Sequence, residues 1–146
     1  MIRLATVLAA FLAAAPALAD LTAARAEPNL EKRSRMALDN ADQVLRLAKE
    51  AYSQGDLQRT QAALEELRDS VLLAHESLRQ TGKNPSRSPR HFKHAEIKTR
   101  GFLRQLGDFR ETMSWEDRDA LDQVRAAIEK VHQELLLGIM GGKKKK

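Results

Sequence analysis

The residues best suited to recognise a ligand lie in one basic stretch near the middle of the chain, residues 83–104. Seven basic residues and one acid, Glu96, give this stretch a net charge of +6. The basic residues are Lys83, Arg87, Arg90, Lys93, Lys98, Arg100 and Arg104. A local excess of one sign this large attracts anions. We therefore expect a basic collar around a helix that begins near residue 89.

Two interpretations of this basic collar are open. Acids on neighbouring helices could pair with it, and exposed pairs of this kind contribute about 0–1 kcal/mol each. Those acids are Glu65, Glu66, Asp69, Glu76, Glu116, Asp117, Asp119 and Asp122. Alternatively, the collar is a docking surface for an anionic partner, either a protein or a component of the cell envelope. Nucleic acid fits less well, because no aromatic residue alternates with the cations to stack bases.

The chain ends in a second cluster of cations. Two glycines are followed by the last four residues, Lys143, Lys144, Lys145 and Lys146. Next to an anionic membrane, each lysine adds about 1 kcal/mol of attraction. The Gly-Gly-polyLys tail at residues 141–146 is therefore either a solvated end or a peripheral membrane contact that acts together with the collar.

The sequence offers little for catalysis or metal binding. It contains no Cys, and its best pair of metal ligands is His91 and His94, which are too few to hold an ion alone. No serine elbow and no glycine-rich phosphate loop occurs. We expect no enzyme activity, no metal and no cofactor. A metal- or small-ligand-binding bundle is the alternative function.

The first 19 residues have the pattern of a cleaved secretory signal peptide. Arg3 precedes an apolar run at residues 4–15, and residues 17–19 have the small-x-small pattern that a signal peptidase recognises. A second pattern of this kind occurs at residues 24–26. The apolar run is shorter than the 20 or so residues that span a bilayer. We expect an exported protein, periplasmic or extracellular, with a retained N-terminal anchor as the alternative.

Apolar residues in the rest of the chain recur at steps of three and four, which is the spacing of an amphipathic helix. The clearest run is Phe92, Ala95, Thr99, Phe102, Leu106, Phe109 and Met113. Comparable runs occupy residues 38–52, 57–78 and 121–135. Each run predicts one apolar helix face that has to be buried against the others.

The residues between these runs indicate where the helices begin and end. Gly55 and Gly82 suit left-handed helix ends, and Asp56 suits the start of a helix. Ser88 and Ser114 are expected to cap the last two helices. The sequence therefore predicts helices at about 29–53, 57–81, 89–112 and 115–138, with Trp115 covering one end of the assembly.

Short connections place consecutive helices side by side in opposite directions. The fold prediction is an all-α antiparallel four-helix bundle of two helical hairpins over residues 29–140, after the signal peptide and a flexible segment at 20–28. Splayed hairpins, or a hairpin that completes its core in a dimer, are the alternatives, so the oligomeric state is left open. The functional prediction is a non-catalytic exported bundle that binds a partner through the basic collar and the tail.

Overall fold

The structure is a computed structural model that describes residues 21–141, and all its regular elements are helical. α1 spans Leu21–Ala26, α2 spans Leu30–Ser53 and α3 spans Leu57–Gln80. α4 spans Arg90–Thr112 and α5 spans Arg118–Ile139, with a short 3-10 turn, η1, at Trp115–Asp117 between them. The all-α prediction is confirmed for this range. The predicted signal peptide and the four lysines of the tail lie outside the described residues.

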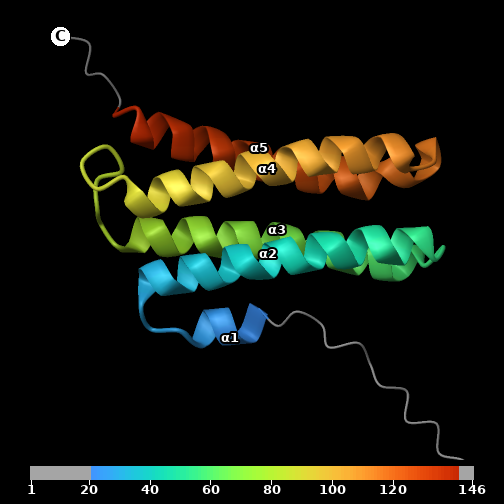
Figure 1. Cartoon of the computed structure of the whole chain (residues 1–146), viewed down its shortest axis with the longest axis horizontal. Helices are drawn as coiled ribbons and strands as arrows, with labels where there is room; N and C mark the ends of the chain where they lie inside the picture. Colours follow the sequence, from blue (N-terminus) through green and yellow to red (C-terminus); the bar gives the residue numbers. More distant parts are fainter. Residues whose placement is uncertain (1–20, 142–146) are drawn as a thin grey trace, which may run out of the picture.

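The four long helices are arranged as two antiparallel hairpins, α2–α3 and α4–α5 (Figure 1). The closest association is between α2 and α3, and the hairpins meet where α5 lies on α3 and α4 lies on α2. The α3–α4 loop and the last turn of α5 are at one end of the bundle (Figure 1). Among residues 21–141, no helix combines the length and apolar character that a membrane span requires.

The core consists of the apolar runs that the sequence predicts. The buried face of α4 contains the whole predicted run from Phe92 to Phe109, and Met113 just beyond the helix is buried as well. α5 buries Leu121, Val124, Ile128, Val131 and Leu135. Leu57 is an exception, because it stands at the first position of α3 and is half exposed. Burial of these side chains holds the helices together.

Two of the predicted helix boundaries are confirmed in detail. The Asp56 carboxylate accepts a hydrogen bond from the Arg59 backbone N–H at 3.0 Å and so caps α3. Gly55 and Gly82 have φ values of 73° and 68°, in the left-handed region that glycine adopts without steric cost. These residues turn the chain after α2 and α3.

The predicted serine caps are wrong. Ser88 does not cap α4, because Pro89 occupies the cap position and Ser88 lies one residue before it; the helix has no side-chain cap. Ser114 likewise makes no side-chain cap. Its carbonyl accepts from the Asp117 backbone N–H at 2.9 Å, which forms η1 and delays the start of α5. At Ser114, a hydrogen bond between backbone groups therefore takes the place of the expected side-chain cap.

The segment at 20–28 differs from the predicted flexible lead. Residues 21–26 form α1, which lies against α2 and buries Leu21 and Ala24. The Arg33 guanidinium donates to the Glu27 carbonyl at 2.8 Å and fixes the connection to α2. Helices this short are marginal by themselves, so tertiary packing stabilises α1, and the sequence pattern gave no sign of it.

Tyr52, rather than Trp115, closes the end of the bundle opposite the α3–α4 loop. Trp115 is 82% exposed, so the expectation that it covers this end is wrong. The Tyr52 hydroxyl donates to the Asp117 carboxylate at 3.1 Å and accepts from the Ser114 backbone N–H at 2.8 Å. Its ring meets Phe109 edge to face, with centroids 5.7 Å apart. Tyr52 therefore binds the first hairpin to the turn of the second.

Removing the Tyr52 hydroxyl tests this connection. Tyr52→Phe keeps the ring but deletes both hydrogen bonds, and we expect a loss of about 1 kcal/mol in the free energy of unfolding, or roughly 4 °C in Tm. Asp117→Ala removes one of the partners, so the losses in the double variant should be less than additive. Urea unfolding of the four proteins measures this coupling. Strictly additive losses would show that the hydroxyl and the carboxylate do not interact.

Candidate anion-binding surface

The side of α4 opposite the core presents a row of exposed residues at steps of three, four, three and four. These residues are Arg90, Lys93, Ile97, Arg100 and Arg104. Together they are called the cationic stripe here. At 1.5 Å per residue, the stripe extends about 21 Å along the helix. Four of its five members are cations, and Ile97 at its centre is 57% exposed.

The structure divides the predicted collar into two groups. Lys83 and Lys98 are engaged within the protein, since Lys83 pairs with Glu31 and Lys98 pairs with Asp42. Both of these acids belong to α2, whereas the sequence interpretation looked to the acids of α3 and α5. The amine groups of Lys83 and Lys98 are therefore part of the contact between the two hairpins.

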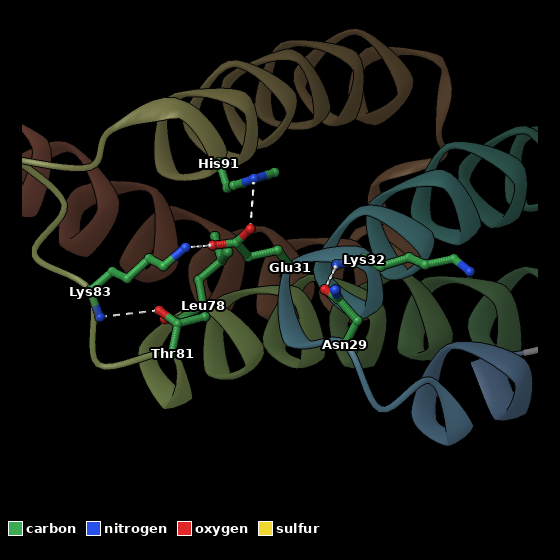
Figure 2. A network of polar contacts seen from close by, with 7 residues as sticks. All are labelled: Asn29, Glu31, Lys32, Leu78, Thr81, Lys83 and His91. Atoms are coloured by element: carbon green, nitrogen blue, oxygen red, sulfur yellow. Dashed lines mark hydrogen bonds and ion pairs between the residues drawn. The ribbon is translucent and has the colours of Figure 1, made fainter.

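Glu31 is the centre of this contact (Figure 2). Its carboxylate binds the Lys83 amine and the His91 ring, and the Oε2–Nε2 distance to His91 is 2.9 Å. The hydrogen bond from Lys83 is the main reason why the pKa of Glu31 lies below its usual value, with His91 and Arg90 adding their charges. Glu31 thus joins α2 to the α3–α4 loop and to the first turn of α4.

The other group of cations faces solvent. Arg87, Arg90, Lys93 and Arg104 are exposed, and none has an acidic partner within 4.0 Å among the described residues. Arg100 is intermediate: it lies 3.4 Å from Glu96, one turn earlier, but 65% of its side chain is exposed. The collar is therefore a stripe on the solvent side of α4, continued by Arg87 at the start of the helix.

At the start of α4, the negative charge of Glu31 is taken up by Lys83 and His91, and the helix itself adds no acid. The first turn of this helix contains no acid and has no side-chain cap. The positive end of the helix dipole therefore adds to the charges of Arg87 and Arg90. The other end of the hairpin has the opposite sign, because residues 108–122 contain six acids and two arginines, a net charge of −4. The bundle is electrostatically polar along its length.

The structure does not bring the predicted metal ligands together. His91 is bonded to Glu31, and the Nε2 atom of His94 is buried without a hydrogen-bond partner. Within the described part of the chain, no three His, Asp or Glu residues are arranged to hold a metal ion. His91 and His94 therefore lack a third ligand here.

Three histidines make contacts with glutamates of another helix that the sequence interpretation missed. Besides His91, the His132 ring lies 3.1 Å from Glu96 and joins α5 to α4. The His75 ring lies 3.6 Å from Glu134 and joins α3 to α5. The sequence indicates no partner for these histidines, because the axial offset between helices is not encoded in the periodicity of their apolar residues. The contacts of His91 and His132 involve α4 itself and hold it against α2 and α5.

A depression between α3 and α5 is large enough to hold a small ligand. Its volume is about 360 Å³, and Leu64, Met113 and Val124 form part of its lining. Acids stand at its edge, among them Glu65 and Asp117. It therefore favours a cationic or neutral ligand, in contrast to the stripe.

Burial of two histidines predicts the pH dependence of stability. Burial lowers the pKa of His75, and burial together with the charges of Arg35 and Lys98 lowers the pKa of His94. Below the unfolded pKa of about 6.5, the unfolded chain takes up more protons than the native protein, so stability falls as the pH falls. Urea unfolding at pH 7.5 and at pH 5.5 should show this loss, and His75→Gln with His94→Gln should reduce it. An equal loss in the double variant would contradict the assignment.

Comparison with known proteins assigns this chain to no family. No family model matches the chain, and neither a curated protein nor a solved structure matches it. Its function is therefore argued from the surface geometry alone.

Proposed function

We propose that this protein is a non-catalytic, exported helical bundle that binds an anionic macromolecular surface through the cationic stripe of α4. The observation that carries the proposal is that Arg90, Lys93 and Arg104 lie in line on the solvent side of α4 with no internal acidic partner. Cations without such a partner can bind an external anion without first breaking a pair. A partner with negative charges in a row about 20 Å long would fit this surface.

The partner class follows from the chemistry of the stripe. Arg90, Arg100 and Arg104 present planar guanidinium groups that suit carboxylates and phosphates equally. An acidic protein surface and an anionic polymer of the cell envelope both offer such groups. Ile97 adds an apolar contact at the centre, which favours a partner that is close enough to exclude water from it.

Of the two possible cleavage sites, the packing of the N-terminal region favours the first, after residue 19. A cut after residue 26 would remove α1 and leave uncovered the α2 surface against which Leu21 and Ala24 are buried. A cut after residue 19 keeps α1 complete. We therefore expect the mature chain to start at Asp20.

N-terminal sequencing of the protein recovered from cells tests this expectation. The exported fraction should contain the protein, and its first residues should read DLTAAR. A chain that begins at Met1, or a start at Glu27, would contradict the proposed processing.

The alternative function, a metal- or small-ligand-binding bundle, draws its support from the depression between α3 and α5. Ligands that bind only the native state raise Tm, and the stabilisation grows with the logarithm of their concentration relative to Kd. A rise in Tm with Zn²⁺ or a small organic cation, abolished by Glu65→Lys with Asp119→Lys, would favour this alternative over the stripe.

Charge reversal on the stripe tests the principal proposal. Lys93→Glu with Arg104→Glu changes two exposed cations that have no internal partner, so the fold should be unaffected. We expect binding to fluorescent poly-L-glutamate to weaken by at least about tenfold, equivalent to about 1.4 kcal/mol. Binding of the unchanged protein should itself weaken between about 50 and about 300 mM NaCl, because salt screens exposed charges.

The matched control changes the net charge by the same amount elsewhere. Arg25→Glu with Arg46→Glu reverses two exposed cations of α1 and α2. This control should bind poly-L-glutamate within about twofold of the unchanged protein if the stripe is the site. Equal weakening in both double variants would show that only net charge matters, and would overturn the proposal.

A further inference from the structure

The end of the bundle beside the start of the stripe also presents apolar side chains to solvent. In the last turns of α5, Leu136 is 39% exposed, Leu137 is 67% exposed and Met140 is 68% exposed. Leu135 in the same helix is buried in the core, so these side chains are on the outer side of α5. Three large apolar residues this close together form an exposed patch of the kind that marks a binding surface.

This patch is fixed against the α3–α4 loop. A Cβ on Gly138 would lie 3.1 Å from the Pro85 Cγ, and a Cβ on Gly141 would lie 2.9 Å from the Ser86 Cβ. Only glycine allows the end of α5 to lie this close to the loop. Arg87, the next residue of the loop, is also exposed.

The register between α4 and α5 places two further cations, Lys93 and Arg90, at the level of this patch. His132 of α5 contacts Glu96 of α4 at 3.1 Å, and the two helices are antiparallel. Lys93 lies one turn before Glu96 on α4, and Leu136 lies one turn after His132 on α5. Lys93 and Leu136 are therefore at about the same level along the bundle. A further turn brings Arg90 to the level of Met140. We call this group of residues the docking end: Arg87, Arg90, Lys93, Leu136, Leu137 and Met140.

The docking end combines two chemistries that meet at the surface of an anionic bilayer. Apolar side chains enter the boundary between headgroups and acyl chains, while cations bind the lipid phosphates. Each Lys or Arg held near such a surface adds about 1 kcal/mol. Four lysines follow Met140 in the sequence after only two glycines, so the sequence after α5 adds four more positive charges. A soluble polyanion would leave Leu137 and Met140 without a role.

The opposite end carries an exposed aromatic residue but the wrong charge. Trp115 is 82% exposed, and tryptophan is common at membrane interfaces. However, it lies within residues 108–122, whose net charge is −4. An anionic bilayer repels that end and attracts the docking end, so the charges of the protein determine its orientation.

We infer that the docking end binds the surface of an anionic phospholipid bilayer, with Leu137 and Met140 inserted among the headgroups and with Arg87 and Arg90 bound to lipid phosphates. This inference rests on the proposed function and narrows its partner to one class. The bundle then stands with its helices pointing away from the membrane and with the α2–α3 turn furthest from it (Figure 1).

Co-sedimentation with vesicles tests the inference. The mature chain should sediment with vesicles of phosphatidylcholine containing about 30% phosphatidylglycerol, and should stay in solution with phosphatidylcholine alone. Leu137→Gln with Met140→Gln should weaken vesicle binding by at least about tenfold, because both apolar contacts are lost. Leu57→Gln with Leu72→Gln, which changes two other exposed leucines, should bind within about twofold of the unchanged protein.

Tryptophan fluorescence tests the orientation. Trp115, the single tryptophan of the chain, should keep its emission maximum when the vesicles bind, because its end of the bundle stays in water. When Leu137→Trp is combined with Trp115→Phe, the emission should shift to shorter wavelengths on binding. A blue shift of Trp115 itself would overturn the inference, as would unchanged vesicle binding after Leu137→Gln with Met140→Gln.

Binding to poly-L-glutamate separates this inference from the proposed function. The Leu137→Gln with Met140→Gln variant should bind that polymer as the unchanged protein does, since the stripe is intact. If the unchanged protein binds the polymer but not the anionic vesicles, the bilayer is the wrong partner and the stripe retains its role. If it binds neither, both proposals fail. Circular dichroism of each variant confirms that the helices are intact.

Discussion

The surface of this protein is determined by the burial of one face of α4. Phe92, Phe102 and Phe109 have to enter the core, and this requirement fixes the rotation of the helix about its axis. This rotation places the opposite side of the helix in solvent, with residues 90, 93, 97, 100 and 104. Residue 98 lies at the side of the helix, where it meets Asp42 of α2. The core therefore decides which cations pair internally and which stay available to a partner.

The internal pairs contribute more to the register of the hairpins than to their stability. Lys83 and Lys98 keep half and almost a third of their side-chain surface exposed, and pairs in such positions contribute about 0–1 kcal/mol. They nevertheless join the two hairpins along the α2–α4 contact, which is less extensive than the contact between α3 and α5. Glu31 strengthens this contact because it meets His91 as well as Lys83 (Figure 2). A stripe on α4 needs such support, since its side chains can act together only if the helix does not move relative to the rest.

The sequence predicted the features that depend on local chemistry or on helical period. The buried run of α4, the Asp56 cap and the left-handed Gly55 all follow from residue types at known spacings. Features that depend on how the helices lie relative to each other were missed. The partner of Lys98 requires the axial offset between α2 and α4, and α1 is stable only because α2 is beside it. Ile97 was missed because it is not part of the apolar run: it lies two residues from both Ala95 and Thr99, on the opposite side of the helix.

The stripe and the docking end share Arg90 and Lys93, but they extend to different distances from a membrane. If the bundle stands on a bilayer with its helices along the normal, Arg90 lies near the lipid phosphates, and Arg104 lies about 21 Å further out. The field of a charged surface decays over about 10 Å at 0.1 M salt, so Arg104 is beyond its reach. Arg100 and Arg104 would then contribute little to membrane attachment. An acidic partner could bind them while Arg87 and Arg90 hold the lipid, because the two interactions use different cations of one helix.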